Sequence, residues 1–324
     1  MTKPSKIFLI LMIGSIGISV IIWKYWPLSF FTNTPVSAAS SSYSADKTPS
    51  MSSALTHSSS LRMRPLDQPS TPAAKLARLY ETSSDKRAFY DLALTQPENG
   101  GRFFASKILM ECMPWIGKDK TNAIWMKTRI ANIPPDFQER DKVERALHRM
   151  HEPCIGFDSS PVAYATFKLG AADDIKDPIV TGIKKINAAL NSPGTSEQLQ
   201  ATLSDIAGTK NAHAMYEALT ILGAANSSNM VVLVDGQALS PEYWDAFLVA
   251  LPAAACQLGV DCTDNAPGLT NQCARGKCFN DLGEYARAGL NPAQFEEYIR
   301  LRDLTSVAIA TRDFSRFTVL RKPK

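Results

Sequence analysis

The stretch TSEQLQATLSDIAGTKNAHAMYEALTILG, residues 195–223, decides the fold class, because it holds two helical segments in direct succession. Thr195 and Gln198 have the spacing of a capping box, and a helix is predicted over 195–207. The Ala-rich segment that follows is predicted to be a helix over 210–223 and is typical of helical hairpins. No fixed repeat period extends beyond it, so no repeat family is assigned.

Start and stop signals of the same kind recur from about residue 71 onward. Thr71-Pro72 and Asn291-Pro292 combine an N-cap with proline at the first helical position, and Ser83 or Ser84 is expected to cap the helix after the first. Further helices are predicted over 102–113, 136–151, 160–170, 175–191, 241–258 and 292–311, with C-caps at Gly208, Gly223 and Gly259. The fold class is therefore all-α, a helical-hairpin or bundle-like array.

A trace of β structure is expected beside these helices. Met230 to Val234 is the one strand-like run, and the turn dipeptide Asp235-Gly236 closes it. Phe317 to Leu320 is the candidate partner, which would give a two-stranded patch.

The N-terminus carries an uninterrupted apolar run from Ile7 to Trp23. As a helix it would be about 25 Å long, at the low end of a membrane span. Lys3 and Lys6 precede the run and outnumber Lys24 beyond it, so the positive-inside rule places the N-terminus in the cytoplasm. The alternative is a signal peptide cleaved near residues 36–38, which would release the rest of the chain into the periplasm.

This run implies four parts of the chain. Residues 1–6 would be a cytoplasmic stub, 7–26 a transmembrane anchor, and 32–71 a Ser/Thr/Pro-rich disordered linker. Residues 72–324 would form a disulfide-stapled helical domain. The expected localisation is the bacterial inner membrane, with one membrane pass and the C-terminal domain in the periplasm.

Six cysteines follow the apolar run, and an even count beyond a membrane signal favours disulfides. Cys112 shares a predicted helix face with Phe104 and Ile108, and Cys154 shares one with Leu147 and Met150. Both thiols would then point into the core, where a Cys112–Cys154 bridge would join two helices.

The other four cysteines, Cys256, Cys262, Cys273 and Cys278, form a cluster that allows three connectivities. Sequential pairing, Cys256 with Cys262 and Cys273 with Cys278, is the expectation. The alternative is that the four cysteines bind a zinc ion, but their spacing lacks the close Cys-x2-Cys pairs of zinc knuckles.

Two short motifs contain residue types that are used in metal binding or in catalysis. His148-x-x-His151-x-x-Cys154 could present metal ligands on one helix face, although two histidines near a helix C-terminus also suit the helix dipole. Ser83-x-x-Lys86 matches the spacing of serine acyl-enzymes, but the companion motifs of those enzymes are missing from the sequence. We assign no catalytic, cofactor-binding or metal-ligating residue, and no cofactor is expected.

The charge distribution limits the class of partner. The formal net charge is +4, and basic residues near the C-terminus account for the excess. Nucleic acid is not expected as a partner on the far side of a membrane. The expected partners are the lipid bilayer, through the N-terminal helix, and a periplasmic protein or envelope component.

Two stretches resemble sequences of uncharacterised membrane-anchored or secreted helical proteins of proteobacteria. They are Arg87-Ala-Phe-Tyr-Asp-Leu-Ala-Leu-Thr-Gln-Pro-Glu-Asn-Gly-Gly-Arg-Phe-Phe-Ala, and Ala255-Cys-Gln-Leu-Gly-Val-Asp-Cys262 with Cys273-Ala-Arg-Gly-Lys-Cys278. The resemblance implies a bacterial source and a periplasmic domain, and it brings no catalytic residues because that group has no assigned activity.

The leading functional hypothesis is therefore a tethered module that binds a protein or an envelope component. A cell-envelope hydrolase is one alternative, with Glu242 or Asp245 acting beside the aromatic residues Tyr243 and Trp244. A structural protein whose tether matters more than its surface is the other.

Overall fold

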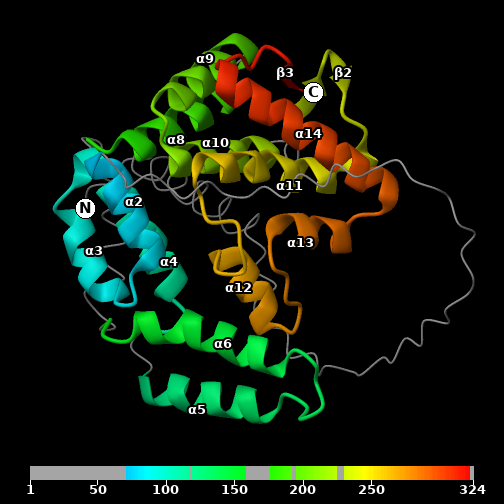
Figure 1. Ribbon diagram of the computed structural model, residues 1–324. Coiled ribbons are helices and arrows are strands. Elements are labelled where there is room, and N and C mark those ends of the chain that lie inside the picture. Colours follow the sequence, from blue (N-terminus) through cyan, green and yellow to red (C-terminus); the bar gives the residue numbers. More distant parts are fainter. Residues whose placement is uncertain (1–70, 117–118, 158–175, 192–194, 225–229, 322–324) are drawn as a thin grey trace, which may run out of the picture. The chain divides into compact units, whose positions relative to one another are not determined.

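The computed structural model describes residues 71–116, 119–157, 176–191, 195–224 and 230–321 (Figure 1). All of them belong to one structural unit, Met63–Lys324. The α-helices of this part are α2 (Pro72–Thr82), α3 (Lys86–Leu94), α4 (Gly101–Cys112), α5 (Asp119–Ala131), α6 (Arg140–His151), α8 (Pro178–Asn191), α9 (Thr195–Gly208), α10 (Ala212–Ala224), α11 (Trp244–Ala254), α12 (Pro267–Ala274), α13 (Leu282–Gly289) and α14 (Pro292–Thr311). Short 3₁₀ turns are η1 (Pro97–Asn99), η2 (Glu152–Cys154), η4 (Pro241–Tyr243) and η5 (Ala255–Leu258).

The predicted all-α class is confirmed, and the capping chemistry explains several helix starts. The Thr71 hydroxyl accepts a hydrogen bond from the Ala74 amide at the start of α2. At the start of α14, Asn291 and Gln294 form a complete capping box. The expected cap of α3 was wrong, because the side chain of Asp85, and not that of Ser83 or Ser84, accepts from the first turn.

The predicted strand pair is confirmed, and a third strand joins it. The order is β2-β1-β3, with β1 (Met230–Val234) antiparallel to both β2 (Gln237–Ala238) and β3 (Phe317–Arg321). Asp235 and Gly236 both have positive φ, as a tight turn between β1 and β2 requires.

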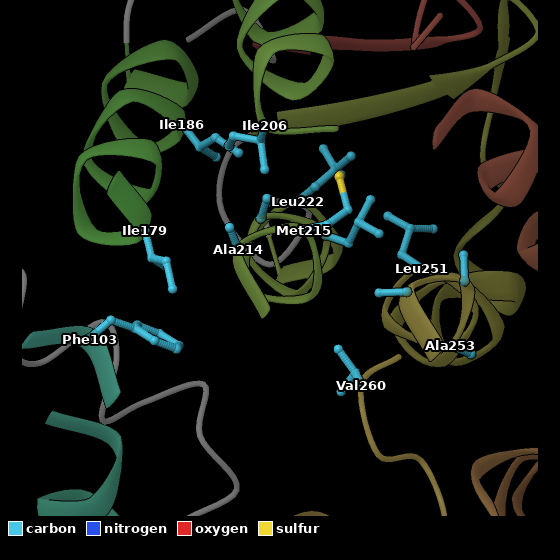
Figure 2. Packing of buried hydrophobic residues seen from close by; sticks show 14 of the residues in the cluster. Phe103, Ile179, Ile186, Ile206, Ala214, Met215, Leu222, Leu251, Ala253 and Val260 are labelled. Carbon is cyan, nitrogen blue, oxygen red and sulfur yellow. The ribbon is translucent and has the colours of Figure 1, made fainter. Parts of the chain in front are cut away.

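The core lies where α8, α9, α10 and α11 meet, with α14 packed along α11. Figure 2 shows Ile186 of α8 and Ile206 of α9 directed toward each other above α10, which contributes Met215 and Leu222. At the edge of this core, Phe103 of α4 lies near Ile179 of α8. Helices α4 and α8 contact each other, which joins the N-terminal helices to the rest of the unit.

A buried carboxylate reinforces that junction. The Asp177 side chain is fully buried and accepts hydrogen bonds from the Ile179 and Val180 amides at the start of α8. It also accepts one from the Phe103 amide in the first turn of α4. Burial raises the pKa of Asp177, and the backbone amides act in the opposite direction. One side chain therefore caps two helices that are distant in sequence.

All six cysteines are paired as expected. The bridges are Cys112–Cys154, Cys256–Cys262 and Cys273–Cys278, with Cα separations of 5.3, 5.8 and 4.0 Å. Cys112–Cys154 joins the last residue of α4 to the turn that follows α6, so it staples two helices. The zinc alternative for the last four cysteines is excluded by this pairing, since a disulfide sulfur is not a thiolate ligand.

Some predicted boundaries differ from the structure. No helix was expected at α5, α12 or α13, although Pro267 and Asp281 stand at the starts of the last two. Gly208 and Gly223 lie inside helices instead of beyond their ends. Gly259 has positive φ and ends η5, as expected. The helix predicted over 160–170, the stub, the anchor and all but the last residue of the linker lie outside the described residues. Of the helices that the structure does describe, none combines the length and apolarity that a bilayer crossing requires.

Candidate functional site

An open apolar groove lies between α5 and the end of α6, which are neighbours in Figure 1. Its volume is about 550 Å³. Helix α5 contributes positions spaced three or four residues apart, as one face of a helix must. The groove is lined by Ala123, Met126, Lys127, Ile130, Ala131, His148, His151, Glu152 and Ile155.

Aromatic contacts hold α5 at this place. The Trp115 ring packs edge-to-face against Trp125 of α5, at a centroid distance of 5.3 Å, and against His151 of α6, at 5.1 Å. Met126 is buried beneath the groove. The Cys112–Cys154 bridge lies close in sequence to both Trp115 and His151 and fixes the end of α4 to the end of α6. Of the two helices that flank the groove, α6 is therefore fixed to α4 by a disulfide, whereas α5 is held by the aromatic contacts.

Large apolar side chains are exposed around the groove. Ile155, which lines it, is 55% exposed, and Ile124 on the outer side of α5 is 67% exposed. Trp125 and Met113, close by in sequence, are also exposed. Single exposed apolar residues are ordinary on a protein surface, and of these four residues only Ile155 lines the groove itself.

Both histidines of the His148-x-x-His151-x-x-Cys154 motif line this groove. His148 Nδ1 is 2.8 Å from Glu152 Oε1, both exposed, and His151 packs on Trp115. Cys154, the third member of the motif, is bonded to Cys112 and is therefore not a ligand. Among the described residues, no group of three or more His, Cys, Asp and Glu side chains is placed to hold a metal ion. Both histidines lie in the last turn of α6, where the helix dipole favours them.

A second cluster of ionisable groups lies inside the unit, where α2 and α3 meet α4. The Tyr80 hydroxyl donates to Glu111, and Lys86 donates to the Tyr80 carbonyl while its Nζ lies 3.9 Å from Glu111. Burial, and then Glu111, raise the pKa of Tyr80 well above its ordinary value. Burial lowers the pKa of Lys86, although Glu111 opposes this.

Two further contacts between ionisable side chains continue the cluster to α10. Lys107 Nζ is 2.6 Å from Glu217 Oε1, and His213 Nε2 is 3.2 Å from Glu81 Oε1. Burial acts to lower the pKa of Lys107, but Glu217, together with Glu111 and Tyr216, outweighs it and leaves this pKa above its usual range. Perturbed ionisable groups often mark functional sites, but ion-pair networks perturb them too.

This cluster has the properties of a structural network. Each of its charges has a partner within it, and together the pairs connect α2, α4 and α10. Glu81 also accepts from the Asp261 amide, next to Cys262 of the second bridge. The groove, in contrast, has apolar walls that no described residue covers, and it is the better candidate for binding.

The residues considered for a hydrolase or an acyl-enzyme lie outside the groove. Glu242 and Asp245 are exposed at the start of α11, where Ser240 donates to Glu242 at 3.4 Å. The groove that the structure describes does not include them. Of the Ser83-x-x-Lys86 motif, Ser83 donates to the Asp85 carbonyl and Lys86 turns toward Glu111, so the two side chains have separate partners.

Comparison with known proteins gives no further assignment: no protein-family model, curated protein or solved structure matches this chain.

Proposed function

We propose that the protein is a binding module whose α5–α6 groove receives apolar side chains of another protein. The observation that carries this proposal is the open groove of about 550 Å³ with exposed Ile155 on its wall. A recess between two helices is the usual receptor for a helix that presents a row of apolar anchors. Burying one large apolar side chain contributes about 1.5–3 kcal/mol, so a few anchors offset the cost of association.

We also propose that this module is held at the periplasmic face of a bacterial inner membrane. Two features support the proposal: the apolar run Ile7 to Trp23 and the pairing of all six cysteines, which suits an oxidising compartment. Mass mapping of the protein purified from membranes tests it. Recovery of residues 1–38 together with the disulfide-linked peptides is expected, and free thiols throughout would refute it.

Site-specific photo-crosslinking of the full-length chain in its native host tests the binding proposal. A photoreactive amino acid at position 155 is expected to give a discrete adduct with another protein. The control is position 307, since Val307 is 57% exposed on α14 and lies outside the groove. Adducts at both positions alike, or only with lipid or a second copy of the chain, would contradict the proposal.

The variant Ile155→Glu separates specific binding from chance proximity. Ile155 is exposed, so a charge there leaves the core intact but places a carboxylate on the apolar wall. We expect this variant, with the photoreactive group moved to position 127, which is exposed and also lines the groove, to lose the adduct that the parent with the same label forms. The matched variant Val307→Glu is expected to keep it. An unchanged adduct in Ile155→Glu would exclude the groove as the binding surface.

A further inference from the structure

We infer that Asn99 and Gly100 form a site of spontaneous deamidation that the fold keeps inactive and that reacts when the turn between α3 and α4 opens. Asn99 is the one asparagine in the sequence that precedes a glycine. It lies in η1, and Gly100 precedes the first residue of α4. The inference concerns this turn alone and does not depend on the groove.

The reactivity of the pair comes from the glycine that the turn requires. Gly100 has a φ of 88°, a left-handed conformation that favours glycine over every other residue. An asparagine followed by glycine loses ammonia more readily than other asparagines do, because glycine has no side chain to hinder ring closure. The same backbone geometry that lets α4 begin here therefore places a reactive pair in the chain.

The reaction consumes only water. The Gly100 nitrogen attacks the side-chain carbonyl carbon of Asn99, and a new C–N bond forms. The side-chain nitrogen of Asn99 leaves as ammonia and takes up the proton of the Gly100 amide. One water molecule then opens the cyclic imide at either of its carbonyls, which gives aspartate or isoaspartate at position 99.

In the folded chain both reacting groups are engaged elsewhere. The Gly100 N–H donates to the Pro97 carbonyl at 3.1 Å, as in a 3₁₀ turn. Asn99 Nδ2 donates to Gln96 Oε1 at 3.4 Å and to Glu98 Oε1 at 3.2 Å. Ring closure needs the Gly100 nitrogen to face the Asn99 side chain, whereas the turn directs this nitrogen at the carbonyl three residues back. The reaction therefore requires η1 to open.

The closed turn has no room for the extra main-chain carbon that isoaspartate introduces. Gly100 and Gly101 are both buried. A Cβ atom on Gly101 would lie 1.9 Å from the Ala93 carbonyl oxygen, and one on Gly100 would lie 2.7 Å from Ile179 Cδ1. The main chain thus packs directly against α3 and α8, and lengthening it at position 99 displaces both glycines. Isoaspartate consequently prevents η1 from closing again in its native form.

The first turn of α4 passes this change to the junction with α8. The Phe104 N–H donates to the Gly100 carbonyl at 3.1 Å, and the Phe103 N–H donates to Asp177 at 2.9 Å. Displacing Gly100 moves the acceptor of the first bond and the helix start that Asp177 caps. The aspartate product leaves the main chain unchanged, and a carboxylate beside the start of α4 suits the helix dipole. The two products therefore differ in their effect on the fold.

Ageing of the full-length chain, with its bridges intact, tests whether the fold controls the reaction. The protein is incubated at mildly alkaline pH, folded or in guanidinium chloride, beside a synthetic peptide of residues 94–105 under each condition. Mass spectrometry follows the aspartate and isoaspartate forms. We expect the unfolded chain to react at the rate of the peptide, and the folded chain to react about tenfold more slowly or less. Equal rates in the folded chain and the peptide would overturn the inference.

Two variants distinguish opening of the turn from unfolding of the whole unit. Asp177→Ala removes the cap from the start of α4 and is expected to speed the reaction of the folded chain. Lys107→Met removes the cation that pairs with Glu217 and serves as the destabilised control, because it leaves the cap in place. Equal rates in the two variants, or no acceleration in Asp177→Ala, would refute reaction through the opened turn.

The products are compared in urea unfolding and hydrogen exchange. Asn99→Asp reproduces the aspartate product and is expected to keep the urea midpoint of the parent. The isoaspartate form, separated by chromatography and refolded, is expected to have a lower midpoint and to lose protection of the Phe104 amide. Asn99→Gln, whose longer side chain closes a ring slowly, is expected to accumulate no product. An isoaspartate form with unchanged midpoint and protection would contradict the packing argument.

Discussion

Removing the Cys112–Cys154 bridge should cost more stability than removing either of the other two. In the chain-entropy model the effect of a cross-link grows with the logarithm of the loop that it closes. The sequence separation of 42 gives about 4 kcal/mol, whereas the separation of 5 at Cys273–Cys278 gives about 2 kcal/mol. The variants are Cys112→Ala/Cys154→Ala and Cys273→Ala/Cys278→Ala.

Urea unfolding of the full-length chain, followed by circular dichroism, measures the difference. Alanine also leaves a small void in both variants, and the void costs more stability at the more deeply buried pair, Cys112 and Cys154. The void therefore favours the same order of stability losses as loop closure does. The slope of the free energy of unfolding against urea separates the two causes. Losing a cross-link expands the unfolded chain and steepens the slope, whereas a void leaves it unchanged.

The order of the two stability losses decides whether loop closure explains what the bridges contribute. Equal losses in the two variants, or a greater loss for Cys273→Ala/Cys278→Ala, would show that loop closure is not what these bridges contribute. A large loss for Cys112→Ala/Cys154→Ala without a change of slope would assign the effect to packing around the end of α4.

Three further predictions concern buried ionisable side chains. Lys107→Met should destabilise the fold by about 3 kcal/mol because it leaves Glu217 buried without its cation. Adding Glu217→Gln to this variant should recover much of the loss, measured as the urea midpoint. A double variant whose loss is the sum of the two single losses would contradict this prediction. Burial raises the pKa of Tyr80, so the protonated hydroxyl contributes its full stabilising effect below pH 10 and this effect is lost as pH rises through the folded pKa. The urea midpoint of Tyr80→Phe should therefore fall less steeply above pH 10 than that of the parent protein. Parallel pH profiles of the two proteins would count against this prediction. Asp177→Ala should cost about 3 kcal/mol or more in urea unfolding, since three amides at two helix starts lose their acceptor, and a loss below 1 kcal/mol would exclude the double cap.

The helices that can be predicted best from the sequence are those whose ends carry capping residues. Helix α14 has the predicted limits, 292–311, because Asn291, Pro292 and Gln294 all favour a start at the same place. The cysteine pairing follows from proximity along the chain. Helix α5 is missed because it has no cap signal and its outward residues Ile124 and Trp125 blur the apolar stripe.

The groove and the internal cluster are less accessible to sequence reasoning. Lys107 and Glu217 are 110 residues apart, so their pairing has no local signature. The groove arises only where α5 meets α6, and it depends on how Trp115 sets the distance between them. The motif His148-x-x-His151 did point to this region, but His151 packs on the Trp115 ring there and His148 contacts Glu152.

The order in which the cysteines pair has a consequence for how the protein matures. The cysteines pair first with second, third with fourth and fifth with sixth along the chain, so none of the three loops encloses or interlocks with another. A chain emerging N-terminus first presents every thiol with its correct partner before a competing one arrives. An oxidase acting on the growing chain would therefore make the native set directly, and biogenesis would not depend on a disulfide isomerase.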